Sequence, residues 1–120
     1  MPWEYKQSSG ELWRNGQKIA QGYSGKGAGK NNDSMENFTT IVPIPRGKYR
    51  INSPRDSVNT GPYVLPLLAV GHTAHGRTSF QIHGDSIKYP GTASSGGIIM
   101  PRAIREKIWG SHDRELTVVR

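Results

Sequence analysis

Apolar residues alternate with polar ones in short runs along most of this chain of 120 residues. The first two runs flank Asn15-Gly16, and an Asn-Gly pair in that setting predicts a two-residue hairpin because both turn residues need positive φ. The pattern therefore predicts paired strands over 11–14 and 17–20. An earlier strand is expected around Trp3 and Tyr5, ahead of the turn residues at 8–10.

Further apolar segments have the length of strands. Alternation at Tyr49 and Ile51, after a turn at Arg46-Gly47, predicts a half-buried strand. Pro62 and Pro66 are expected to limit how deeply the segment around them lies in a sheet, because proline cannot donate a ladder hydrogen bond. The other predicted strand segments are 63–70, 79–82, 97–100 and 116–119.

One helix is predicted, over residues 101–109. Pro101 suits the first helical position, Gly110 follows the last one, and Ile104 and Ile108 would form the buried face. A hydrophobic content of 33% with 15 Gly and 8 Pro favours many short strands over a helical bundle. We therefore expect a compact, mainly β protein with one short helix, folded as a single domain over 1–120.

Charge and composition narrow the classes of partner. The net charge of +7 favours anionic partners such as nucleic acid, lipid headgroups or a carboxylate-rich cell wall. No aromatic–basic strand motif supports nucleic-acid binding, and no apolar run is long enough for membrane insertion. The N-terminus lacks the apolar core of a secretion signal, so export would need another route. The absence of Cys excludes disulfides and thiol catalysis in this chain.

Two segments suggest a nucleotide or a metal, but neither fits the pattern that such a site requires. The loop Gly25-Lys26-Gly27-Ala28-Gly29-Lys30 lacks the first Gly and the Ser or Thr of a phosphate-binding loop, so a basic loop over a site is the better interpretation. His72, His75 and His83 with Asp85 could be imagined around a metal, but a His-x-x-His in a turn-rich segment is weak evidence. We expect no cofactor and no metal.

The chemistry is expected around His83, which ends an apolar run and is followed by Gly84. A lone His at the end of a strand is more often structural. Here, however, a Ser-x-Gly-x turn opens another apolar run, and its last position, Gly97, falls fourteen residues after the His. The two elements together indicate a site.

These elements resemble the signature of YkuD-type L,D-transpeptidases, whose second element reads Ser-x-Gly-Cys. Residues 44–51 look like the Pro-x-Gly-x-aromatic strand found upstream in that superfamily. Residues 22–32 and 98–102 are similar to one branch, the small L,D-transpeptidase-like effectors of type VI secretion systems. The resemblance covers most of the chain and implies an L,D-transpeptidase-like β-sandwich or barrel.

The resemblance also implies a reaction. In the family a Cys thiolate attacks the carbonyl of the third residue of a peptidoglycan stem tetrapeptide and expels the terminal D-Ala, and the thioester then passes to water or to an amine. His83 would be the general base and acid, within a His83-Gly84-Asp85 motif. Ser95, Gly96 and Gly97 would form the nucleophile turn, with backbone N–H groups at 96 and 97 as the oxyanion hole.

Substrate binding, partners and location follow from the same resemblance. Tyr23, Lys30 and Arg102 would contact the substrate, with the basic groups holding its carboxylates. The implied partners are peptidoglycan stem peptides, a cognate immunity protein and a delivery component of the secretion system. The site of action would be the periplasm of rival bacteria. We expect a monomer, since no long apolar surface stripe is evident.

Gly97 is where this chain departs from the family, because it occupies the position of the nucleophilic Cys. Loss of a nucleophile typically costs on the order of a millionfold in turnover, so the chain is predicted to be inactive. Ser95 is a weak substitute, since a hydroxyl ionises far less than a thiol. Gly97 fits an engineered inactivation and a natural inactive homologue equally. The alternative hypothesis is therefore a natural pseudoenzyme that binds peptidoglycan or an immunity protein.

Overall fold

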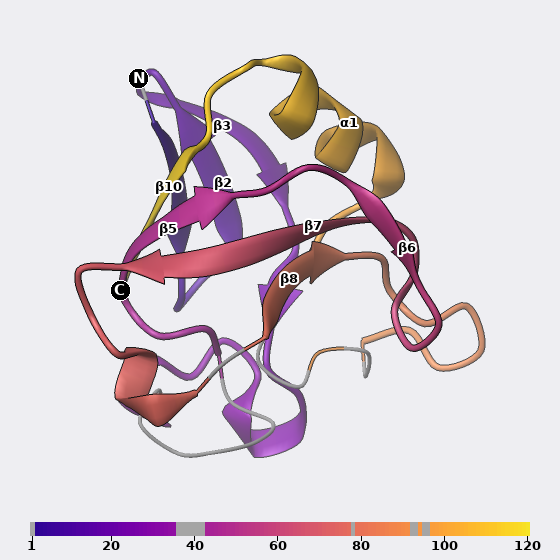
Figure 1. Cartoon of the computed structure of the whole chain (residues 1–120). Coiled ribbons are helices and arrows are strands. Elements are labelled where there is room, and N and C mark those ends of the chain that lie inside the picture. The colour runs from indigo at the N-terminus through magenta and orange to yellow at the C-terminus, as the bar shows by residue number, and fades with distance from the viewer. Residues whose placement is uncertain (1, 36–42, 78, 92–93, 95–96) are drawn as a thin grey trace.

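The computed structural model describes residues 2–35, 43–77, 79–91, 94 and 97–120. Its main feature is one mixed sheet with the strand order β3-β2-β1-β10-β5-β7-β8-β9-β4, and β6 pairs with β7 (Figure 1). The strands are β1 (Trp3–Lys6), β2 (Glu11–Arg14), β3 (Gln17–Gln21), β4 (Tyr23–Ser24), β5 (Gly47–Ile51), β6 (Arg55–Ser57), β7 (Gly61–Val70), β8 (Phe80–His83), β9 (Ile98–Ile99) and β10 (Glu115–Val119).

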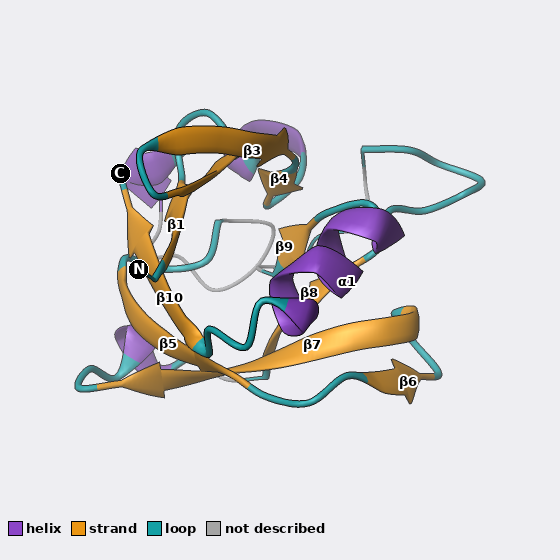
Figure 2. Cartoon of the chain, turned by 90° about the horizontal axis from the view of Figure 1, so that it is seen from above, coloured by secondary structure: helices purple, strands orange, loops and turns teal. Residues whose placement is uncertain are grey.

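The sheet curls round, and its two end strands are consecutive in the chain. β3 ends at Gln21 and β4 begins at Tyr23, so Gly22 alone separates them. Figure 2 shows the resulting curl, with β3 and β4 on one side of the molecule and β5 and β7 on the other. The predicted mainly β fold is confirmed.

The first hairpin forms as predicted. β2 and β3 pair antiparallel across Asn15 and Gly16, which have φ values of 53° and 75°. Positive φ at both central residues is the geometry that matches the twist of the flanking strands.

The helix α1 (Arg102–Gly110) confirms the predicted helix with a shift of one residue. Pro101 precedes it as the N-cap, with an extended ψ of 154°, and its carbonyl accepts hydrogen bonds from the N–H groups of Ile104 and Arg105. Figure 2 shows α1 lying across β7 and β8. The described connections contain the short 3₁₀ helices η1 (Gly27–Gly29), η2 (Asp33–Met35) and η3 (Ala74–Gly76).

The expectation that proline would limit the depth of the 63–70 segment is wrong. β7 lies inside the sheet, between β5 and β8. Pro66 is accommodated because β5 pairs only with residues 67–70, and beyond its end the carbonyl of Pro66 accepts a hydrogen bond from the N–H of Asn52. In an antiparallel strand the backbone N and O of one residue point to the same side. The nitrogen of Pro66 therefore faces the β5 side, at a position beyond the end of the β5–β7 pairing, where no N–H is needed.

Buried side chains fill the inside of the curled sheet. The largest of them are fully buried aromatic and aliphatic residues, including Trp3, Tyr5, Tyr49, Leu65 and Met100. Ile108 of α1 packs into the same cluster, and Ile104 lies at its margin, as the helix pattern predicted. No helix in the described part of the chain has the length and apolar character needed to cross a membrane.

Candidate functional site

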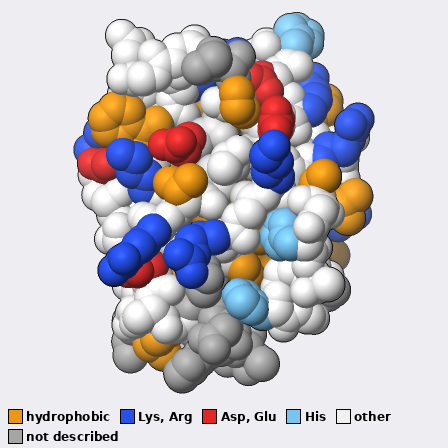
Figure 3. Space-filling view, turned by 90° about the vertical axis from the view of Figure 1, so that its left-hand side faces the viewer, with side chains coloured by type: hydrophobic (Ala, Val, Ile, Leu, Met, Phe, Trp, Pro, Cys, Tyr) orange, Lys and Arg blue, Asp and Glu red, His pale blue; other side chains and the backbone are white. Residues whose placement is uncertain are grey.

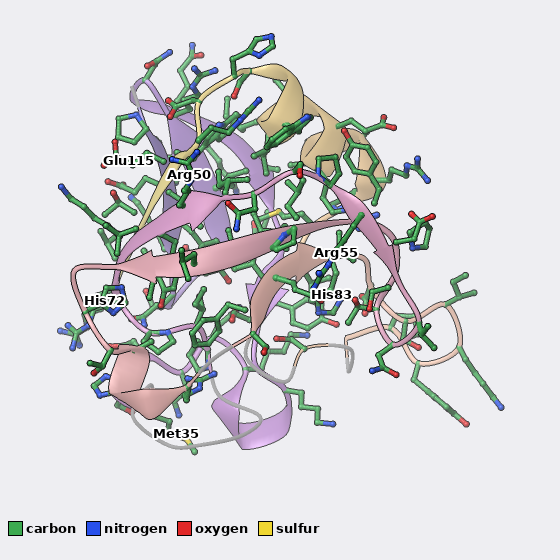
Figure 4. The ribbon with its side chains drawn as sticks, in the orientation of Figure 1. Met35, Arg50, Arg55, His72, His83 and Glu115 are labelled. Carbon is green, nitrogen blue, oxygen red and sulfur yellow. The ribbon has the colours of Figure 1, made fainter. Side chains whose placement is uncertain are left out.

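Three strands bring the site together. β9 pairs parallel with β8, with Ile98 opposite Ile82 and Ile99 opposite His83. β4 pairs antiparallel with the other side of β9, with Tyr23 opposite Ile99. Segments that are far apart in the sequence therefore meet at the end of β8, where Figure 4 shows His83.

His83 is oriented with one ring nitrogen held by the backbone. The side chain is buried, with 5% of its surface exposed. Its Nδ1 lies 3.0 Å from the carbonyl oxygen of Gly84. Because a carbonyl only accepts, Nδ1 donates the proton and Nε2 remains the basic nitrogen.

Position 97 faces that basic nitrogen. A Cβ atom built on Gly97 would lie 3.4 Å from both Nε2 and Cδ2 of His83. A side chain at this position would therefore contact the base directly. The same Cβ would lie 2.6 Å from the carbonyl oxygen of Gln81, so the backbone here is closer to β8 than a residue with a side chain allows.

Two serine hydroxyls hold the carbonyl of Gly97. Ser24 donates to this oxygen at 2.6 Å, and Ser94 donates to it at 2.8 Å. Each hydroxyl also accepts a backbone N–H at 2.8 Å, that of Ile44 for Ser24 and that of Gly25 for Ser94. The buried Ser94 therefore helps to fix the turn at Gly97. The sequence analysis gave Ser24 no role, although it lies in the 22–32 segment of the resemblance.

Two of the predicted site residues, Ser95 and Gly96, lie outside the described residues. Their roles as a substitute nucleophile and as part of the oxyanion hole stay predictions.

Asp85 organises the loop that follows His83. Its Oδ1 accepts a 2.5 Å hydrogen bond from the Tyr23 hydroxyl and a 2.8 Å bond from the N–H of Ser86, and both carboxylate oxygens lie within 3.1 Å of the N–H of Gly91. Lys30 Nζ lies 4.4 Å from the centre of the Tyr23 ring. The structure therefore brings Tyr23, Lys30 and Asp85 together, beside His83.

This network controls the charge of Asp85. Partial burial by itself would raise the pKa of the carboxyl group, but the hydrogen bonds from Tyr23, Gly91 and Ser86 and the nearby Lys30 charge outweigh it. The pKa of Asp85 therefore lies below its usual range, and the carboxylate is ionised at neutral pH.

We expect Asp85→Ala to release the loop over 85–91. The amides of Ser86 and Gly91 would lose a charged acceptor worth about 1.5–3 kcal/mol, so their hydrogen exchange should accelerate about tenfold or more. Exchange measured by NMR would test this, with the Gly76 amide as an internal control because it bonds instead to Thr73. Unchanged protection of Ser86 and Gly91 would contradict a role for Asp85 in ordering the loop.

The surroundings of His83 favour its neutral form. Burial, the largest effect, lowers the pKa of the imidazole. The hydrogen bond to the Gly84 carbonyl opposes it, the positive charge of Arg105 adds to it, and Asp85 has the smallest, opposing effect. A general base must be neutral to accept a proton, so this environment suits that role at neutral pH.

The same shift predicts a pH dependence of folding. Unfolded His83 binds a proton near pH 6.5, whereas the folded residue stays neutral to lower pH. Its contribution to stability is complete above pH 6.5 and is lost as the pH falls towards the folded pKa, with a slope of at most about 1.4 kcal/mol per pH unit. The free energy of unfolding, measured with urea, should fall less between pH 7.5 and pH 5.5 for His83→Gln than for the unmodified chain. An equal fall in the free energy of unfolding for the two proteins would contradict the lowered pKa of His83.

A pocket of about 750 Å³ opens beside His83. It is lined by residues 58–62 from the β6–β7 turn, by residues 83–88, and by Arg105 of α1. Arg102 is not part of this lining. Its exposed guanidinium lies 5.0 Å from the centre of the Tyr63 ring and pairs with Glu106 at 3.3 Å.

His72 has a structural role instead of a metal-binding one. Its Nε2 lies 3.0 Å from the carbonyl oxygen of Lys48, its Nδ1 accepts from the N–H of Ala74 at 3.2 Å, and its ring meets the Tyr49 ring edge-on. Within the described ranges, no group of three His, Asp or Glu side chains is placed to hold a metal ion.

Basic side chains are mixed with acidic ones on the face shown in Figure 3. Lys48 of β5 lies 3.9 Å from Glu115 of β10, and Arg14 lies 3.7 Å from Asp113. On this face the positive charge does not form the continuous stripe typical of nucleic-acid binding.

Comparison with known proteins identifies a family. The model of the Tlde1 domain matches residues 18–119, which include every element of the site. This domain defines a family of L,D-transpeptidase-like effectors of type VI secretion systems that target peptidoglycan. The match confirms the predicted effector family. No curated protein and no solved structure matches the chain significantly.

Proposed function

The chain belongs to the Tlde1 domain family, and from this premise we propose that it is a catalytically silent form of an antibacterial effector that acts on peptidoglycan stem tetrapeptides. The observation that carries the proposal is the 3.4 Å between Nε2 of His83 and a Cβ built on Gly97. A nucleophile at position 97 would contact its general base there, and Gly97 supplies no nucleophilic atom.

The geometry supports the family's reaction for a form with Cys at position 97. Nε2 of His83 takes the thiol proton, and the sulfur bonds to the carbonyl carbon of the third stem residue. The bond from that carbon to the D-Ala nitrogen then breaks, and Nε2 returns the proton to the departing amine. Water hydrolyses the thioester in the second half of the reaction. The Gly84 carbonyl keeps the ring in one tautomer throughout.

Delivery and partners extend the same proposal. Members of the family are delivered by the type VI secretion system into the periplasm of target cells. This chain would follow that route, meet peptidoglycan there, and be bound by an immunity protein in the cell that produces it. The test is expression of the Gly97→Cys form with a periplasmic signal, which should stop growth where this chain does not.

A second candidate is a natural pseudoenzyme that binds stem peptides without cleaving them. It is favoured by the close approach of Gly97 to the carbonyl of Gln81, which is compatible with Gly alone in the present backbone, together with a pocket that is open beside His83. Isothermal titration of a tetrapeptide into this chain would test it. Micromolar binding supports the pseudoenzyme, and an absence of binding removes it.

A further inference from the structure

Arg105 carries a buried positive charge that its surroundings leave largely unsatisfied. Only 4% of its surface is exposed. Among the described residues, its one hydrogen bond runs from NH1 to the carbonyl oxygen of Met100 at 3.4 Å, and none of them partners its buried Nε. Across the described ranges, no Asp or Glu forms an ion pair with it. A guanidinium has five N–H donors, and a buried charge is costly unless an anion compensates it.

The guanidinium lies against the backbone beside the general base. A Cβ built on Gly84 would lie 3.0 Å from NH1 and 3.4 Å from NH2. The glycine after His83 therefore allows the close approach of this cation. Arg105 also lines the pocket that contains His83 and the 84–88 loop. The unsatisfied charge thus faces the place where a substrate would lie.

We propose that Arg105 binds the terminal carboxylate of the stem peptide in this pocket. The inference rests on the proposed function and names the group that its site recognises. A carboxylate supplies the missing negative charge, and its two oxygens match the two terminal nitrogens of a guanidinium. In a tetrapeptide the terminal carboxyl carbon is three bonds from the scissile carbonyl carbon, so it must lie close to the base that protonates the D-Ala amine.

This assignment predicts a length preference. A fifth residue would move the terminal carboxylate about 3.5 Å further from the scissile bond, beyond the reach of the two terminal nitrogens. Arg105 would then select tetrapeptides over pentapeptides. It replaces Arg102 as the residue best placed for a substrate carboxylate near His83.

The experiment is isothermal titration of this chain with a stem tetrapeptide carrying either a free carboxylate or a carboxamide at its C-terminus. We expect amidation to weaken binding about 10- to 100-fold, the range for a hydrogen bond to a charged group. Arg105→Gln should weaken binding of the free acid equally and make the variant indifferent to amidation. The control, Lys107→Gln, removes the same charge from an exposed position of α1 and should bind as the unmodified chain does.

The outcomes separate the two proposals. Equal binding of the acid and the amide by the unmodified chain overturns the role of Arg105, and this arm needs no variant that must fold. Retention of full affinity for the acid by Arg105→Gln overturns it as well. If neither tetrapeptide binds and Gly97→Cys is also inert, the proposed function fails together with the carboxylate site.

Discussion

Gly97→Cys is expected to convert this chain into an enzyme that releases the terminal D-Ala from tetrapeptide muropeptides. The substitution places a sulfur on a Cβ that lies 3.4 Å from the basic nitrogen of His83. Removal of a nucleophile from such a unit typically lowers turnover on the order of a millionfold, so its return should raise the rate by a comparable factor. Mass spectrometry of muropeptides after incubation with each protein measures the loss of D-Ala directly.

Two matched variants separate chemistry from packing. Gly97→Ala adds the Cβ, and with it the 2.6 Å approach to the Gln81 carbonyl, but no sulfur. Both substitutions should cost about 1–3 kcal/mol of stability because the backbone must shift, and Gly97→Ala should remain inactive. Adding His83→Gln to Gly97→Cys should abolish D-Ala release. A folded Gly97→Cys protein that leaves tetrapeptides intact would contradict the assignment of position 97, and cleavage by the Gly form would place the nucleophile elsewhere.

Gly22→Ala is expected to have the largest effect on stability. Gly22 is the single residue between β3 and β4, the two end strands of the sheet. A Cβ there would lie 1.7 Å from the carbonyl oxygen of Ile99 and 2.9 Å from the Met100 sulfur. β4 cannot stay paired with β9 under that overlap, so we expect a loss of about 3 kcal/mol or more in the free energy of unfolding. Urea unfolding followed by tryptophan fluorescence would measure it.

The control for this prediction is Gly110→Ala. Nothing lies within 4 Å of a Cβ at Gly110, which is the last residue of α1. Alanine is the better helix former, so this substitution should be neutral or stabilising by up to about 1 kcal/mol. Equal stability of the two variants would contradict the close packing of β4 on β9. Because β4 carries Tyr23 and Ser24, Gly22→Ala should also reduce tetrapeptide binding.

Elements determined by local chemistry could be predicted from the sequence. The Asn15-Gly16 hairpin follows from two residues that tolerate positive φ, and the helix follows from Pro101, Gly110 and the spacing of its isoleucines. The mainly β class follows from many short alternating runs. The prediction for Pro66 was wrong because it depends on where β5 ends. β5 pairs only with residues 67–70 of β7, so no strand on that side needs an N–H from Pro66. The end of β5 is set by pairing across the sheet, which the local sequence does not show.

The candidate site was predictable only where a motif marks it. His83 and Gly97 form a recognisable pair, and the resemblance connected Tyr23 and Lys30 to them. Ser24 lies in the same segment of the resemblance but had no predicted role, and Arg105 lies outside the segments of the resemblance. The importance of both comes from tertiary packing. In the sequence, Arg105 is one of several charged residues of the predicted helix. It differs from Arg102 in the structure, where its side chain is buried and no described carboxylate pairs with it.

The parallel pairing of β1 with β10 has a consequence for how the protein folds. Trp3 lies opposite Leu116 and Lys6 lies opposite Val119, so the first strand joins the main sheet through the last one. During folding the strands over 3–21 can therefore join the main sheet only when β10, far away in the sequence, is in place. Contacts of such long sequence separation form slowly. The sheet should therefore be completed late in folding, after its local hairpins have formed.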